Sequence, residues 1–139
     1  MSDKLDGAII IDLDYPRRLH FDFNALNELE QMLGESTIDI LESISLASGK
    51  GGDDTGRAFL RIFNMHKTTM FLRAGLLHQN PGLGFKEAAE LFNFAKGDSI
   101  IAKYIYVATK IVEAFVTDMA GREAVKEAKK KQTETLIGK

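Results

Sequence analysis

The stretch RLHFDFNALNELEQMLG, residues 18–34, changes its apolar pattern near its middle. Leu19, Phe21 and Phe23 alternate with polar residues, which is the period of a strand with one buried face. From Ala25 onward the apolar residues recur every three or four positions, which is the period of an amphipathic helix. The stretch therefore predicts a strand that runs directly into a helix.

This helix has recognisable ends. Asn24 is the predicted N-cap, because its side-chain oxygen can accept a hydrogen bond from a backbone N–H of the first turn. Gly34 stands at the predicted C-terminal stop. The expected inner stripe consists of four apolar residues: Leu26, Leu29, Met32 and Leu33.

Upstream lies a second short apolar segment, Ala8 to Leu13, separated from Arg18 by a turn that contains Pro16. The two segments, 8–13 and 18–23, predict a β-hairpin. Because an isolated two-stranded ribbon is marginal in water, helices from the rest of the chain must cover its apolar face.

Two different segments follow the first helix. Ser36 or Thr37 can cap a second helix that ends at Ser48–Gly49, and its expected inner residues are Ile38, Leu41, Ile44 and Ala47. Residues 49–56 contain four glycines and no apolar side chain, so they predict a mobile loop. Lys50 and Asp53 lie in this stretch.

Three further helices are predicted from apolar spacing. Residues 57–78 predict one central helix of about 30 Å, in which Gly75 is tolerable if another backbone approaches it. Residues 85–94 predict a short fourth helix. Asp98 is the expected N-cap of a long last helix, whose apolar stripe runs from Ile101 to Met119 and is broad enough for more than one neighbour.

Composition limits the classes of protein. With 139 residues the chain suffices for one domain, which we place at residues 8–119, with a surface helix and flexible tail at 120–139. The fold class is α+β, mainly α: an N-terminal β-hairpin packed on a bundle of about five helices.

A net charge of −2 argues against nucleic acid as a partner. The sequence has no cysteine, no basic apolar leader and no long apolar run, which argues against thiol chemistry, export and membrane insertion.

No constellation for catalysis or metal binding emerges. His20, His66 and His78 lack a second ligand at metal-site spacing and are interpreted as surface or helix-end histidines. Asp12 and Asp14 share a strand face and could hold a hard cation, but edge solubility and turn formation explain them better. The glycine-rich stretch lacks the order of a phosphate-binding loop. We therefore expect no enzyme, no cofactor and no metal.

Residues 18–34 and the segment FLRAGLLHQNPGL, residues 71–83, followed by the acidic helix at 87–92, resemble the tail assembly chaperones of long-tailed phages, prophages and gene transfer agents. With the long last helix the resemblance spans residues 8–119. Family members usually carry Thr or Ser where Gly84 stands here, which weakens only the cap of that helix.

The resemblance implies a non-enzymatic factor of the host bacterial cytoplasm. Such a protein coats the helical tape-measure protein before the tail tube polymerises and is absent from the finished particle. A broad apolar face suits that role, because exposed apolar stripes of a client would otherwise aggregate. Candidate partner-binding residues are Tyr106 and Val116 on the last helix, and Lys50 and Asp53 in the glycine-rich stretch. The same apolar residues could instead complete the core or support a homo-oligomer.

The resemblance also implies a longer product made by ribosomal frameshifting, whose extension recruits the tail tube protein. Lys129–Lys131 would permit the slippery run A AAA AAG in the gene. Two rival functions stay open: a structural tail component, such as a tube or connector subunit, and a small DNA-binding regulator. The sequence lacks a basic recognition helix, which argues against the DNA-binding regulator.

Overall fold

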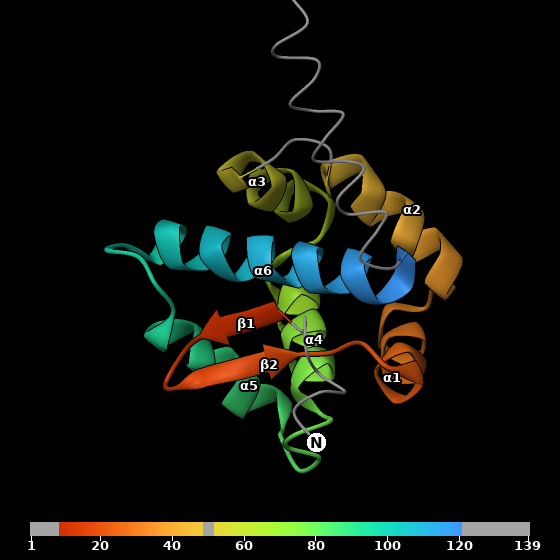
Figure 1. Ribbon diagram of the computed structural model, residues 1–139, viewed down its shortest axis with the longest axis horizontal. Coiled ribbons are helices and arrows are strands. Elements are labelled where there is room, and N and C mark those ends of the chain that lie inside the picture. Colours follow the sequence, from red (N-terminus) through yellow and green to blue (C-terminus); the bar gives the residue numbers. More distant parts are fainter. Residues whose placement is uncertain (1–8, 49–51, 121–139) are drawn as a thin grey trace, which may run out of the picture.

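One helix, α6 (Ile100–Ala120), crosses the molecule, and the other elements pack around it (Figure 1). The computed structural model describes residues 9–48 and 52–120. Within these ranges there are six α-helices and one two-stranded antiparallel sheet, so the domain is α+β and mainly α. The remaining elements are β1 (Ile9–Asp12), β2 (Pro16–Leu19), α1 (Phe23–Leu33), α2 (Thr37–Ser48), α3 (Gly52–Ile62), α4 (Met65–Leu76), α5 (Phe85–Leu91) and the 3-10 turn η2 (Phe92–Phe94).

The broad apolar face of α6 is shared among several neighbours, as its sequence predicted. It contacts α2 and α3 on one side and the hairpin on the other, and also reaches α4 and η2. Val107, Ala108, Ile111 and Phe115 of α6 are fully or almost fully buried. Because the stripe occupies more than one side of the helix, no single partner helix could cover it.

The predicted hairpin is confirmed, with different limits for its second strand. Ile9 pairs with Leu19 and Asp12 pairs with Pro16, so β2 begins earlier than expected and ends before Phe21. Phe21 is buried, as expected from its alternation with Leu19. The interpretation of Phe23 was wrong: it begins α1 and is 88% exposed.

The first helix ends where the sequence indicated but begins two residues earlier. Asp22, rather than Asn24, is the N-cap, and its Oδ1 accepts a 2.9 Å hydrogen bond from Ala25 N. Gly34 has φ 71°, the left-handed conformation that closes a helix at glycine. Met32 was assigned to the inner stripe wrongly, since it lies at the exposed edge of α1.

The second helix begins at a serine cap. Ser36 Oγ accepts a 3.1 Å hydrogen bond from Asp39 N, one of the two caps expected. The buried residues of α2 are Ile40, Ile44 and Ala47. Ile38 is 63% exposed, so its predicted inward position was wrong. Ile40, which was not among the predicted inner residues, faces the core instead.

The largest correction concerns residues 52–78. Residues 52–56, predicted as part of a mobile loop, form the first turns of α3, and the expected single helix 57–78 is two helices. The break falls at Phe63–Asn64, where Asn64 Oδ1 accepts a 2.9 Å hydrogen bond from Lys67 N and caps α4. An asparagine that caps a new helix is a local signal that the apolar pattern masked.

Gly56 has a packing role in α3. A Cβ at this position would lie 2.7 Å from the carbonyl oxygen of Ile105 and still closer to Thr109 Oγ1. The backbones of α3 and α6 can therefore approach only because this residue has no side chain. The glycine is used for close packing and not for chain mobility.

Gly75 also permits close packing in α4, although the atoms nearest to its missing Cβ belong to side chains and not to the backbone that was expected there. A Cβ there would lie 2.8 Å from Leu19 Cδ2 and 3.0 Å from Phe21 Cζ. The end of the hairpin crosses α4 at this point, and His20 N donates a 2.9 Å hydrogen bond to Gly75 O.

The last helix is capped by Ser99 and not by Asp98. Ser99 Oγ accepts a 3.1 Å hydrogen bond from Ala102 N, and its carbonyl accepts one from Lys103 N. Between α4 and α6, the predicted short helix is confirmed as α5 followed by η2.

Five phenylalanines form the centre of the core. Phe59, Phe63 and Phe71 pack with ring centroids 4.8–5.2 Å apart, and Phe115 and Phe21 extend the cluster. They come from α3, the α3–α4 break, α4, α6 and the end of the hairpin. Each aromatic pair contributes about 0.5–1.5 kcal/mol of stability beyond that from the burial of its apolar area, so the cluster holds five segments together.

Candidate functional site

The two sequence elements that carry the resemblance are in direct contact. Residues 18–34 supply the hairpin end and α1, and residues 71–83 supply the second half of α4 and the turn after it. His20 N donates to Gly75 O, and Arg18 O lies 2.8 Å from His78 Nε2. The two segments therefore form one packed unit.

Arg73 is the polar centre of that unit. Its Nη1 donates to Glu28 Oε1 of α1 at 2.8 Å, and its Nε donates to the carbonyl of Leu83 at 2.9 Å. One guanidinium thus joins α4, α1 and the Pro-Gly-Leu turn. Nearby, Gly84 N donates to Glu87 Oε1, so the helix after the turn has a backbone cap contact despite the missing Thr or Ser side chain.

His20 and His78, which are far apart in the sequence, lie next to each other in the structure. The rings of His20 and His78 are 5.4 Å apart and nearly perpendicular, and His20 Nδ1 is 3.4 Å from Asp118 Oδ1. His66 lies elsewhere, against Phe85. Within the described residues no group of three or more His, Asp or Glu side chains could hold a metal ion.

The two aspartates of the hairpin have separate partners. Asp14 accepts two hydrogen bonds, at 2.8 and 2.9 Å, from the guanidinium of Arg17, and these bonds lower the pKa of Asp14 and raise that of Arg17. Asp12 Oδ2 lies 3.1 Å from Lys96 Nζ, and this hydrogen bond raises the pKa of Lys96. Each aspartate therefore has a structural role at the hairpin.

Tyr106 and Val116, proposed as partner-binding residues from the sequence, have internal contacts. Tyr106 Oη accepts a 2.9 Å hydrogen bond from Asp12 N and so holds the edge of β1 against α6. Val116 is half-buried and packs on the core. Lys50 lies outside the described residues. The backbone of Asp53 belongs to α3, and its side chain is outside the described part.

Several large apolar side chains point into solvent instead. The most exposed are Phe23 at 88%, Ile100 at 79%, Leu46 at 76% and Ile38 at 63%. Single exposed apolar residues are normal, but these four each leave well over half of their surface uncovered. They are stronger candidates for partner contact than Tyr106 or Val116, and the sequence had assigned Phe23 and Ile38 to the core.

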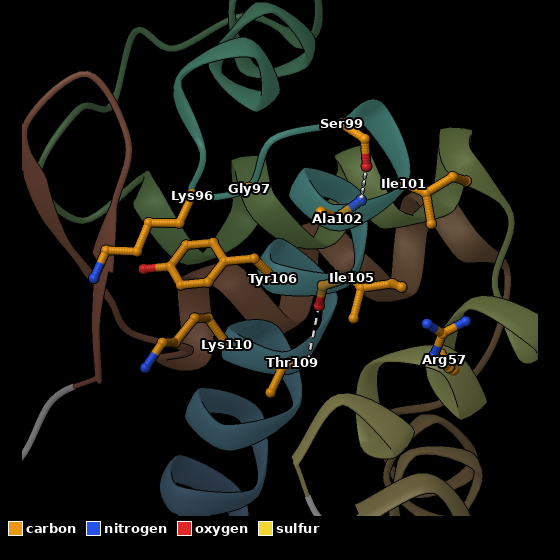
Figure 2. A pocket seen from close by; sticks show the side chains of 10 residues that line it. All are labelled: Arg57, Lys96, Gly97, Ser99, Ile101, Ala102, Ile105, Tyr106, Thr109 and Lys110. Atoms are coloured by element: carbon orange, nitrogen blue, oxygen red, sulfur yellow. Dashed lines mark hydrogen bonds between the residues drawn. The ribbon is translucent and has the colours of Figure 1, made fainter.

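A pocket of about 440 Å³ lies over the first half of α6 (Figure 2). Lys96 and Lys110 lie on either side of the Tyr106 ring, with their Nζ atoms 6.0 and 5.9 Å from its centroid. Arg57 of α3 and Ile105 of α6 lie on the opposite side of the helix in this view. Sequence patterns did not predict this pocket, because its basic residues come from separate segments of the chain.

Comparisons with known proteins add no relative. The chain matches no protein-family model, no curated protein and no solved structure. Among the described residues, no helix is both long and apolar enough to cross a lipid bilayer.

Proposed function

We propose that this protein is a tail assembly chaperone that binds and solubilises a tape-measure protein during phage or prophage tail morphogenesis. The observation that carries the proposal is the direct contact between the two segments of the resemblance. The hydrogen bonds from Arg73 to Glu28 and from His20 N to Gly75 O join them. A resemblance spread over two packed, mutually bonded segments is better support than two loose motifs in unrelated places.

The exposed apolar side chains supply a means of binding. A client helix that presents an apolar stripe can bury it against side chains such as Phe23, Ile38 and Leu46. Burial of one such side chain contributes about 1.5–3 kcal/mol, so a few contacts suffice for reversible binding. The proposed activity is therefore coverage of apolar surface, with no chemical step.

The same proposal includes the partners and the compartment. The protein acts in the host bacterial cytoplasm, and a frameshifted longer form contacts the tail tube protein. Neither nucleic acid nor a membrane takes part. The chain leaves the assembly before the particle is complete.

A solubility assay tests this proposal. The tape-measure protein from the same genome is expressed alone, with this chain, and with the double variant Phe23→Ser/Leu46→Ser. We expect soluble tape-measure protein only with the unmodified chain, and a several-fold loss with the double variant. Equal solubility in all three cultures would overturn the proposal.

Matched controls separate client binding from folding. Asn27→Ser in α1 and Glu42→Ser in α2 change exposed polar residues on the same two helices. These controls are expected to support as much soluble client as the unmodified chain. A structural tail subunit, the main rival, would not raise the solubility of the tape-measure protein.

A further inference from the structure

The pocket over α6 combines positive charge with an apolar floor. Arg57, Lys96 and Lys110 come from α3, from the segment before α6 and from α6 itself. The whole chain carries a net charge of −2, so three cationic side chains around one hollow are a local departure from its overall charge. Figure 2 shows Arg57 on one side of α6 and both lysines on the other.

These cations are only weakly engaged. Lys96 pairs with Asp12 at 3.1 Å and Lys110 with Glu113 at 3.4 Å, and both pairs are solvent-accessible. Exposed ion pairs contribute little, because water screens them. Arg57 is exposed and has no hydrogen bond or ion pair among the residues that the structure describes. An incoming carboxylate can therefore pair with these groups at little cost.

The floor favours an apolar side chain. Ile101 is 59% exposed at the pocket, and Ile105, which is only 6% exposed, contributes the edge of its side chain one turn further along α6. The hydroxyl of Thr109 donates to the carbonyl of Ile105 at 2.8 Å, so it is already used within the helix. A volume of about 440 Å³ lies within the usual range for ligand pockets, which begins at about 300 Å³.

We propose that this pocket binds an acidic amphipathic segment of a partner protein, which places a large apolar side chain against Ile101 and carboxylates beside Arg57 and the two lysines. Charge complementarity favours this occupant, because a basic segment would meet Arg57, which has no carboxylate partner among the described residues, and two lysines that are paired only at the surface. A phosphate group alone would leave the apolar floor uncovered. The inference is independent of the proposed tail-assembly role, because only the pocket carries it.

The test uses a pair of synthetic peptides and the full chain. One fluorescent peptide of about 15 residues, ~22 Å long as a helix, carries Leu at helical spacing with Glu between, and the second replaces every Glu by Lys. Fluorescence anisotropy measures binding. We expect saturable binding of the Glu peptide, affinity at least ~10-fold lower for the Lys peptide, and weaker binding at high salt.

Two matched variant pairs place the binding in the pocket. Ile101→Glu is expected to weaken the Glu peptide at least ~10-fold, because it removes an apolar contact and adds a like charge. Phe94→Glu, at a position about as exposed as Ile101 but outside the pocket, should have little effect. Arg57→Gln is expected to weaken binding about threefold, and Arg61→Gln on the same helix should not.

Four results would overturn the inference. The first three are no saturable binding of the Glu peptide, equal affinity for both peptides, and equal effects of the paired variants. The fourth is self-association in sedimentation that Ile101→Glu abolishes, since it would assign this surface to a second copy of the chain. Circular dichroism shows whether each variant is folded, and Arg57→Gln keeps the test decisive if Ile101→Glu is not.

Discussion

The backbone N–H of Phe21 donates a 2.8 Å hydrogen bond to Oδ2 of Asp118, although 97 residues separate them in the sequence. The other carboxylate oxygen of Asp118 lies 3.4 Å from His20 Nδ1. The pairing of β2 with β1 ends at Leu19, and a side chain near the end of α6 therefore accepts the hydrogen bond from the backbone N–H of Phe21. This contact lies where the hairpin gives way to α1.

Replacement of Asp118 by Ala should lower the free energy of unfolding by about 1–3 kcal/mol, because it leaves the partly buried N–H of Phe21 without its charged acceptor. Urea denaturation measures the change. Glu90→Ala, at an exposed position of α5, is the control and should change stability by less than ~0.5 kcal/mol. Similar losses in the two variants would contradict the role given to Asp118.

Gly56→Ala tests the helical assignment of the glycine-rich stretch. In an exposed helix the substitution would stabilise by up to ~1 kcal/mol, and in a mobile loop it would change little. Here the added Cβ meets the Ile105 carbonyl at 2.7 Å, so we expect destabilisation of about 1–3 kcal/mol. Thermal unfolding of this variant beside Gly82→Ala, whose Cβ meets nothing within 4 Å, decides between these outcomes.

The Asp14–Arg17 pair makes a small part of the stability depend on pH. The hydrogen bonds from Arg17 lower the pKa of Asp14 below its ordinary value of 3.8. The stabilisation is therefore complete above that value and is lost as the pH falls through the lower folded-state pKa. Unfolding of the chain and of Asp14→Asn from neutral pH downward should give curves that converge in acid, with a neutral-pH difference under ~1 kcal/mol. A constant difference would contradict the assignment.

Exposed apolar residues should matter for the client and not for the fold. Phe23→Ser and Leu46→Ser are expected to change the free energy of unfolding by less than ~0.5 kcal/mol, because each side chain is more than three-quarters exposed. Denaturation and client solubility are measured on the same preparations. A large loss of stability would show that these side chains support the fold, and the client result would then carry no weight.

Local sequence patterns predicted the hairpin, α1, α2, α5 and α6, because alternation and helical spacing are properties of single segments. They failed at Gly56, where the side-chain-free position is required by α6, a segment far along the chain. The caps at Asp22 and Ser99 were missed narrowly, since Asn24 and Asp98 are equally able to cap a helix.

The interaction surfaces were less accessible to sequence reasoning. Tyr106 was expected to face a partner, yet its hydroxyl holds β1, and only the three-dimensional pairing with Asp12 reveals this. Arg57, Lys96 and Lys110 likewise become neighbours only after α3 and α6 pack. Periodicity identifies a buried face, but it does not determine which residues at its edges stay exposed, as Phe23 shows.

The most direct measurement of the central claim is quantitative mass spectrometry of this chain in two samples from the same producing cells: complexes purified through a tagged tape-measure protein, and finished particles. The proposed chaperone role requires the chain to be abundant in the complexes and absent from the particles. Stoichiometric amounts in finished particles, or none bound to the tape-measure protein, would contradict it.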